Sequence, residues 1–312
     1  MQKSIFINWP LGRSNDLLLR EYQTALCLEI ERDSSYFKQP IETLYLAAPR
    51  ANGVGIKCLL DTSGTLIKTV TFAEHPEYSL EIGQIPLLES EVAAWQHVGI
   101  NRVVIQYNED SLVHIEQLRK NVDTITRYIK NISVDLYTAC ANTISIVSAL
   151  PITHISLYTV TDFSSAKKII EDAGFVSYEW QHFARNGFAS KHALNYWNHG
   201  LYKGFGAGAC SFDGECRTKN SDAIQDYLDR IQRNQLPYSY EERLSAQEIY
   251  FEKIMMGLRK PQGVCKQLIS PETKERMDDL ILNGFLIDRG ETVGYTDRGF
   301  LVENEILTQI IN

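Results

Sequence analysis

The chain has 312 residues, of which 44% are hydrophobic and 22% are charged, and its formal net charge is −8. These values are typical of a globular protein with one large or two ordinary domains. The acidic balance argues against nucleic-acid binding, and no apolar run reaches the roughly 20 residues of a membrane span. Because the N-terminus also lacks the apolar core of a signal peptide, we expect a cytoplasmic protein.

Strands and helices alternate in the first half of the chain. Short apolar runs predict strands at 4–8, 43–47, 79–83, 102–106, 133–137 and 154–160. Helical spacing of apolar residues predicts helices at 16–31, 89–97, 110–129, 144–150 and 165–173. Such alternation is typical of parallel strands joined by crossover helices. Six units are too few for a closed eight-fold barrel, so a partial open barrel and a doubly wound sheet both fit.

Residues 178–212 are dense in aromatic side chains, histidines and glycines. Glycines at 204, 206 and 208 permit close backbone approach, because they lack a Cβ atom. Aromatic side chains supply flat apolar area with a polar tip. This segment therefore has the composition of a pocket wall for a large planar or apolar ligand, and a turn-rich domain junction packed with aromatics is an equal alternative.

The last third of the chain is mainly helical. Apolar spacing predicts helices at 223–233 and 244–258, and Ser270-Pro271 begins another that Gly284 ends. A hairpin at 285–288 and 292–295 precedes a final helix from Thr296 to 311. This order resembles a winged helix, but without a basic face we expect a structural cap.

The residues around the glycine run resemble the signature of one family. The matching residues are Tyr178-Glu179, Phe183-Ala184, Gly187-Phe188, His192, Asn195-Tyr196-Trp197 and 204–209. Their order and spacing resemble the oxygen-independent coproporphyrinogen III oxidase-like family, which includes the bacterial haem chaperones of the HemN/HemW type. Two positions differ: the family's His-Asn pair reads His192-Ala193, and its histidine after Gly-Ala-Gly-Ala is Cys210.

The resemblance implies an α/β fold with two parts. The first is a partial (β/α)6 TIM-like barrel of the radical S-adenosylmethionine (SAM) type, which we place at 1–176. The second, at 177–312, is a HemN-like C-terminal domain, mainly helical and with a small wing-like hairpin. The matching residues become sparse before 178, so the barrel is expected to be a degenerate member of its type.

The resemblance implies that this chain lacks the ligands of the family's iron–sulfur cluster. Family members hold the cluster with CxxxCxxC after a motif that aligns with residues 7–11, so the ligand positions fall on Gly12, Asp16 and Leu19. The family's glycine-rich cofactor loop reads Ala-Ala-Pro-Arg-Ala at 47–51, which opposes close backbone approach. We therefore expect no cluster, no bound SAM and no radical catalysis. The six cysteines are scattered and form no CxxC motif, so we expect them to be reduced thiols.

Two sets of candidate site residues follow from the resemblance. Positions that match or adjoin the family's cofactor pocket are Glu81, Arg102, Gln106 and Asp135. Polar strand ends that satisfy one another are an equal interpretation of these four. The haem-binding candidates are His192, Cys210 as a thiolate, His199 as a second imidazole, and Tyr196 and Trp197 beside the macrocycle. A hydrogen-bonded structural histidine is the simpler interpretation of His192.

Three functions fit these residues. The first, which we favour, is a non-catalytic protein that binds haem or porphyrin and assists haem trafficking. The second is a pseudoenzyme that binds a protein partner without haem. The third is a cluster-independent enzyme whose four polar pocket residues line the barrel mouth at strand carboxyl ends. We expect haem, porphyrin or a protein as partner, and no nucleic acid.

Overall fold

The fold is built on one large sheet. The computed structural model describes residues 3–12, 16–33, 39–51, 53–108, 112–160 and 162–311. Twelve strands lie in the order β12-β11-β10-β9-β1-β2-β3-β4-β5-β6-β8-β7. The parallel part is β1 (Lys3–Asn8), β2 (Ile41–Ala48), β3 (Phe72–Ile82), β4 (Arg102–Asn108), β5 (Asn131–Thr138) and β6 (His154–Thr159). The helices beside these strands are α1 (Asp16–Arg32), α2 (Gly53–Thr69), α3 (Glu89–His97), α4 (Leu112–Thr126), α5 (Ala141–Ser148) and α6 (Phe163–Asp172).

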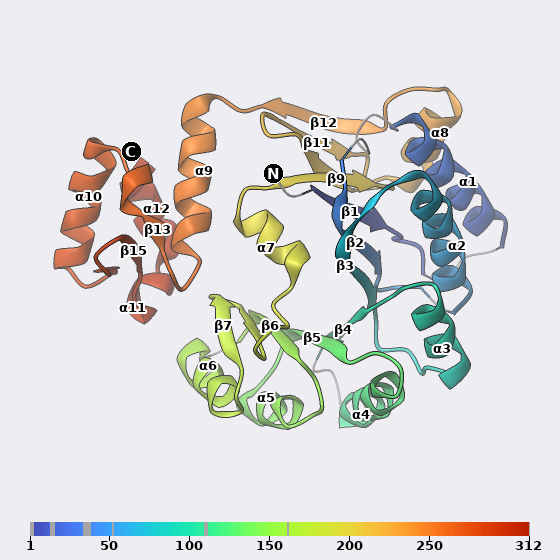
Figure 1. Ribbon diagram of the computed structural model, residues 1–312, viewed down its shortest axis with the longest axis horizontal. Helices are drawn as coiled ribbons and strands as arrows, with labels where there is room; N and C mark the ends of the chain where they lie inside the picture. The colour runs from blue at the N-terminus through green and yellow to red at the C-terminus, as the bar shows by residue number, and fades with distance from the viewer. Residues whose placement is uncertain are drawn as a thin grey trace.

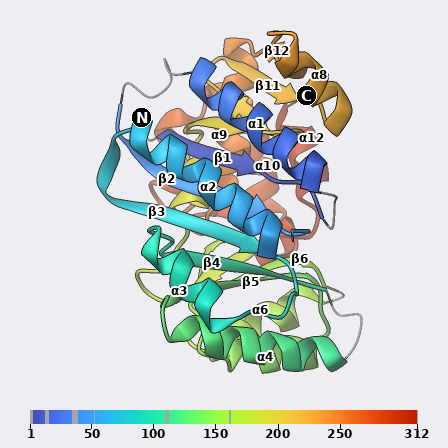
Figure 2. The same ribbon diagram turned by 90° about the vertical axis from the view of Figure 1, so that its right-hand side faces the viewer.

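The strand order decides between the two expected architectures. Strands β1 to β6 are neighbours in chain order, and right-handed crossovers therefore put all their helices on one face. A doubly wound sheet needs a reversal of strand order, so that alternative is wrong. Figure 1 shows the strands curling into an open arc with α1–α6 outside it, and Figure 2 shows α1 and α2 lying across β1–β3. The expected partial barrel is confirmed.

The aromatic and glycine-rich segment extends this sheet at both ends. Its elements are β7 (Val176–Glu179), β8 (His182–Ala184), α7 (Lys191–Trp197), β9 (Leu201–Phe205) and β10 (Cys210–Phe212), followed by β11 (Cys216–Asn220), α8 (Ile224–Gln232) and β12 (Tyr238–Arg243). Strand β8 pairs antiparallel with β6, and β9 pairs parallel with β1. The chain between them places α7 inside the arc, against β2, β1 and β9 (Figure 1).

A second hydrophobic core lies beside the open side of the arc. It is formed by α9 (Ala246–Leu258), β13 (Val264–Cys265), α10 (Pro271–Leu282), β14 (Leu286–Asp288), β15 (Thr292–Tyr295), α11 (Asp297–Phe300) and α12 (Glu303–Ile311). Trp180 joins this core and stacks on Phe300 with ring centroids 4.6 Å apart. Arg259 ties the core to the sheet, because it donates to Glu179 and Gln181 at 2.7 and 2.8 Å and also to Glu303 at 2.7 Å. The division expected between residues 176 and 177 falls within β7, directly after its first residue.

Several predicted elements differ from the observed ones. Helix α2 has no counterpart among the predictions, since glycines at 53, 55 and 64 lower its helix propensity. Strand β3 begins seven residues before the predicted strand, at Phe72 rather than 79. The final helix is interrupted and forms α11 and α12. Residues 110 and 111 of the predicted helix 110–129 lie outside the described residues.

The glycine run is anchored to α1 by the buried side chain of Glu29. Gly206 and Gly208 have φ angles of 93° and 74°, and a Cβ atom at Gly206 would collide with the Asn8 carbonyl oxygen. The Glu29 carboxylate accepts from Gly206 N at 2.8 Å, Tyr227 Oη at 2.7 Å and Asn220 Nδ2 at 2.7 Å. Burial raises the pKa of Glu29 despite these donors. This carboxylate therefore joins α1, the glycine run, β11 and α8.

Glu29→Ala is expected to lower the free energy of unfolding by about 3 kcal/mol, because it leaves Gly206 N and Tyr227 Oη without this acceptor and removes one of the two acceptors of Asn220 Nδ2. Urea unfolding followed by circular dichroism measures the change. Glu31→Ala, at an exposed position of the same helix, is the matched control. Equal unfolding free energies for the two variants would contradict the anchoring role of Glu29.

Candidate functional site

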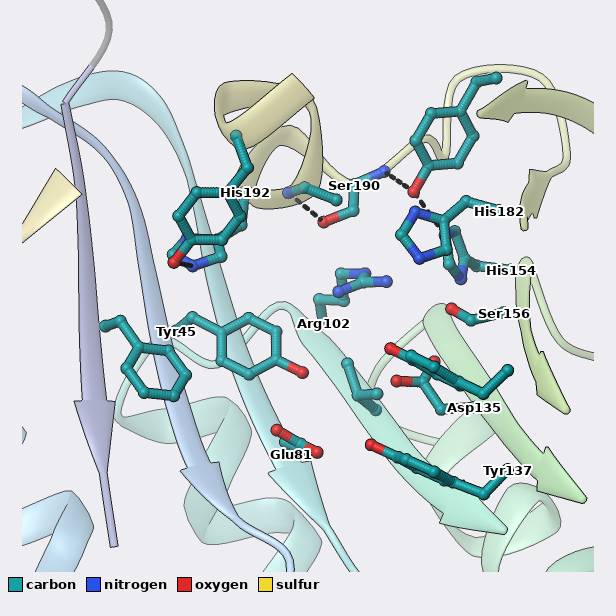
Figure 3. A pocket seen from close by; sticks show the side chains of 16 residues that line it. Tyr45, Glu81, Arg102, Asp135, Tyr137, His154, Ser156, His182, Ser190 and His192 are labelled. Carbon is teal, nitrogen blue, oxygen red and sulfur yellow. Dashed lines mark hydrogen bonds between the residues drawn. The ribbon is translucent and has the colours of Figure 1, made fainter. Parts of the chain in front are cut away.

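A cavity of about 250 Å³ lies inside the arc of strands (Figure 3). Its lining is mostly aromatic and polar and comprises Phe6, Tyr45, Glu81, Arg102, Val104, Asp135, Tyr137, His154, Ser156, Tyr158, Tyr178, His182, Ser190, His192, Ala193 and Tyr196. Pockets for drug-sized ligands span about 300–1,000 Å³, so this one is small. It is large enough for a small molecule or for one edge of a larger one.

The polar lining follows from the alternation of side chains along each strand. On β5, Ser133, Asp135 and Tyr137 alternate with the fully buried Val134 and Leu136, which pack in the main hydrophobic core. Gln106, Asp135, Ser156 and His182 occupy one row of paired positions across β4, β5, β6 and β8. Branched apolar residues fill the interior of closed barrels. A polar interior of this kind is therefore suited to holding a ligand.

Helix α7 is fixed at one side of the cavity by Glu77. The Glu77 carboxylate accepts hydrogen bonds from Ser190 Oγ at 3.0 Å, Lys191 N at 2.8 Å and His192 N at 3.1 Å. Glu77 is buried and pairs with Thr43 in the register of β2 and β3. This contact sets the position of His192 and Tyr196, which α7 carries.

The ring of His192 is neutral and of defined tautomer. Its Nδ1 lies 2.6 Å from Thr43 Oγ1, and the Thr43 hydroxyl donates to Ser4 Oγ at 2.8 Å. Because Thr43 has one hydroxyl proton, Nδ1 must be the donor toward Thr43, and Nε2 accepts from Tyr196 Oη at 3.0 Å. Burial lowers the pKa of His192 to about 4, against the opposing charge of Glu77. Nε2 therefore carries a lone pair, as a metal ligand requires.

Two further histidines line the opposite side. His154 Nδ1 contacts Ser133 Oγ and its Nε2 contacts Tyr178 Oη, both at 2.7 Å. His182 Nδ1 is buried without a hydrogen bond, since the nearest oxygen of Glu179 is 3.6 Å away. Burial, with the positive charge of Arg102, lowers the pKa of His182 to about 3 and holds that of His154 well below its usual range. Both rings are therefore neutral.

Two carboxyl groups and one guanidinium group share the middle of the cavity. Burial, with the negative charge of Asp135, raises the pKa of Glu81 to about 7, although Gln106 donates to it. Burial also raises the pKa of Asp135, which accepts from Ser133 Oγ at 3.3 Å. Arg102 lies between these groups and α7, as Figure 3 shows.

The structure gathers some of the sequence-predicted residues and separates others. Five of the candidates line this cavity: Glu81, Arg102, Asp135, His192 and Tyr196. Gln106 does not line it but donates a hydrogen bond to Glu81. The expectation that all four polar pocket residues lie at strand carboxyl ends is wrong for Arg102, which is the first residue of β4. The reason is that its side chain enters the cavity from the amino end of the strand.

The other three haem-binding candidates lie outside the lining of this cavity. His199 Nε2 pairs with Glu252 at 2.9 Å, and Arg259 lies 5.1 Å from the Trp197 ring. Cys210 is half-buried on β10, and burial raises the pKa of its thiol, which opposes thiolate formation.

Sequence reasoning missed much of the lining. The residues that it did not single out include Tyr45, Tyr137, His154, Ser156, Tyr158 and His182. The alternation of polar and apolar residues within the predicted strands was the available signal.

The residues at the family's cluster-ligand positions do not fit an iron–sulfur cluster. Asp16 is exposed at the start of α1, Leu19 is buried in the main core with 3% exposure, and Gly12 lies against Arg50. None has a thiol. Within the described ranges, no group of three or more His, Cys, Asp and Glu side chains is arranged to hold a metal ion. We therefore derive no chemistry from a cluster.

Sequence comparisons show which known proteins the chain is similar to. No family model matches the chain. A protein named heme chaperone HemW from Bacillus subtilis is 24% identical over 342 residues, covering 92% of this chain and 90% of its own. Heme chaperone HemW from Synechocystis is 25% identical over 371 residues, covering 99% and 88%. The chain is therefore similar along most of its length to proteins of the HemN/HemW type.

A solved structure extends this similarity to the fold. HemN from Escherichia coli, described as a coproporphyrinogen III oxidase and a radical SAM enzyme, matches with a TM-score of 0.79 at 14% identity. The match covers 100% of this chain and 90% of HemN. As in the sequence-based expectation, no described helix has the length and apolar character to cross a membrane.

The raised pKa of Glu81 predicts a pH-dependent stability. Between its ordinary pKa of 4.5 and its folded value of about 7, the folded state holds a proton that the unfolded state releases. Stability from this group is therefore complete below the lower value and is lost as pH rises through the upper one. Glu81→Gln removes the titration, so the variant should gain stability relative to the parent by at most about 3 kcal/mol as pH rises.

Urea unfolding of both proteins at about pH 5 and about pH 8 measures this difference. Glu171→Gln, at an exposed position of α6, is the control and should show no such change. A difference between parent and Glu81→Gln that stays constant across the range would mean that Glu81 keeps an ordinary pKa.

Proposed function

We propose that this chain binds haem or a related porphyrin and assists haem trafficking without radical catalysis. Its full-length relatives are named heme chaperones, and its chain covers about nine-tenths of theirs. In this proposal the open arc of the barrel binds haem or porphyrin, and the chain does not carry out the radical reaction that requires an iron–sulfur cluster.

The observation that carries the proposal is the state of His192. Its imidazole is neutral, its Nδ1–H is held by Thr43, and its Nε2 lone pair meets only the hydroxyl of Tyr196. A hydrogen bond at the far ring nitrogen orients metal-ligating histidines in the same manner. Tyr196 is only half-buried, so its rotation would free Nε2 for an iron atom at the cavity rim.

The size of the cavity supports a ligand that enters only in part. A volume of about 250 Å³ accepts one edge of a porphyrin, and the remainder would lie outside, beside Tyr196 and the 44% exposed Tyr158. Stacked aromatic pairs line this region: Tyr45 with His192 at 4.9 Å, and Tyr137 with Tyr158 at 4.5 Å. Such rings offer flat apolar surface to a macrocycle.

The non-catalytic part of the proposal rests on the three cluster positions. Gly12, Asp16 and Leu19 supply no thiolate, and the buried Leu19 could not be replaced by a ligand without disturbing the core. Cysteines at 27 and 58 lie elsewhere, within α1 and α2. A protein of this kind would bind its cargo without altering it.

Titration with haemin tests the role of His192. We expect a shifted Soret band with the parent protein and at least a tenfold loss of affinity in His192→Ala, because a coordinate bond to iron is removed. Tyr196→Phe is expected to bind at least as tightly as the parent, since the hydroxyl that competes for Nε2 is gone. His97→Ala, at an exposed position of α3, is the control. A Soret shift that His192→Ala leaves unaltered would remove the proposal.

Anaerobic reconstitution with iron and sulfide tests the absence of radical chemistry. We expect a colourless protein, because no described group of side chains has the thiolates of a cluster site. Iron and sulfide analysis of the desalted protein gives the measurement. Stoichiometric iron and sulfide with the broad visible absorption of a cluster would contradict the proposal.

A further inference from the structure

We infer that the inner end of the cavity is a carboxylate-binding site with Arg102 as its cation. The inference deepens the proposed function and rests on it in one respect, since a haem or porphyrin would supply the carboxylate through a propionate side chain. A free small carboxylic acid would supply the same group. The site is otherwise independent of iron coordination by His192.

Arg102 is a buried cation without a direct partner. It is 3% exposed and its side chain points into the cavity (Figure 3). Its Nε is buried and has no hydrogen bond, and no ion pair joins it to a carboxylate within the described part of the chain. Buried guanidinium groups are normally paired, since an unpaired buried charge is costly. Arg102 therefore has donors available for a ligand.

The carboxylates around Arg102 are already engaged elsewhere. Glu77 accepts three hydrogen bonds from the start of α7, and Asp135 accepts from Ser133. Burial alone would lower the pKa of Arg102, but the charges of Glu77, Asp135 and nearby tyrosines raise it. These acids keep the guanidinium charged and leave its inward donors unoccupied.

The charges in the cavity favour a single negative charge on the ligand. His154, His182 and His192 are neutral, so Arg102 is the one permanent cation among the lining residues. Glu81 and Asp135 would repel a doubly charged group such as phosphate. The raised pKa of Glu81, about 7, allows that carboxyl to take up a proton when an anion enters. A carboxylate, planar and singly charged, matches the fork of the guanidinium.

The ring of His182 also lines the cavity and belongs to the row that includes Asp135 and Ser156. Its buried Nδ1, however, lies 3.6 Å from Glu179, which is not part of the lining, so we assign this atom no role in the ligand site. The inference rests on the unsatisfied guanidinium of Arg102, because buried polar atoms are nearly always paired.

The test compares acid and ester forms of one metal-free ligand, so that iron coordination plays no part. Mesoporphyrin IX and its dimethyl ester are titrated against the parent protein by fluorescence. We expect the diacid to bind at least tenfold more tightly than the ester, as a charge-assisted bidentate contact implies. Arg102→Gln should reduce this ratio to about twofold or less, and Arg102→Lys should retain part of it. Arg127→Gln, at an exposed position directly after α4, is the control.

A second arm identifies the source of the carboxylate. Sodium propionate is added at constant ionic strength, with sodium chloride as reference, and the melting temperature is measured. Stabilisation of the parent but not of Arg102→Gln, without discrimination between porphyrin acid and ester, supports the site with a free acid as its ligand. That outcome leaves the carboxylate site intact and removes the porphyrin from it.

Absence of both effects in the parent protein would overturn the inference. This conclusion needs no variant, so it holds even if Arg102→Gln fails to fold. A haemin Soret shift that depends on His192 would still stand in that case, and the two proposals therefore fail separately.

Discussion

The contact between Glu77 and the start of α7 is the constraint on which the site depends. The barrel is open, so nothing in the sheet itself closes its interior. Three donors from α7 converge on this one buried carboxylate and hold the helix against β2 and β3. Without that contact, His192 and Tyr196 would have no fixed relation to the strands. The cavity exists because a helix far along the chain is hydrogen-bonded to an early strand.

The electrostatics of the cavity follow from its burial. Carboxyl groups that lose water are pushed toward their neutral form, and imidazoles likewise lose their proton. The cavity is thus lined by neutral histidines and by two carboxyl groups with raised pKa values, around one charged arginine. Such a lining is nearly neutral yet rich in donors, which suits a ligand with a flat apolar body and an acidic edge. The same arrangement offers no thiolate and no cluster of metal ligands among the described residues.

The chain shares the architecture of HemN but has no cysteine at the positions where the resemblance places cluster ligands. The E. coli enzyme with which it shares its fold is described as a radical SAM enzyme. Here the corresponding loop holds Gly12, and α1 begins with an exposed Asp16 followed by a core residue, Leu19. Leu19 now contributes to packing between α1 and the sheet. The C-terminal core is in turn locked to the sheet through Arg259 and Trp180.

Much of the fold and the resemblance to HemN/HemW-type proteins could be predicted from the sequence, because apolar periodicity and the residues around 178–209 are local signals. The six parallel strands, most helices, the Ser270 cap and the hairpin at 286–295 all arise from short-range patterns. Helix α2 was not predicted, because its glycines weaken the helical pattern of apolar residues.

Only the tertiary structure decided which polar residues share a cavity. His192 and Tyr196 come from α7, while Glu81, Arg102 and Asp135 come from three separate strands. Their proximity depends on sheet curvature, on strand register and on the Glu77 contact, none of which is encoded in the spacing of a motif. His199 and Cys210 share that motif, yet their side chains lie outside the cavity, because position along the chain does not set the direction of a side chain. The sequence by itself determined the kind of fold and the absence of a CxxxCxxC motif. The tertiary structure determined the site, because a cavity depends on the relative positions of residues that are distant in the chain.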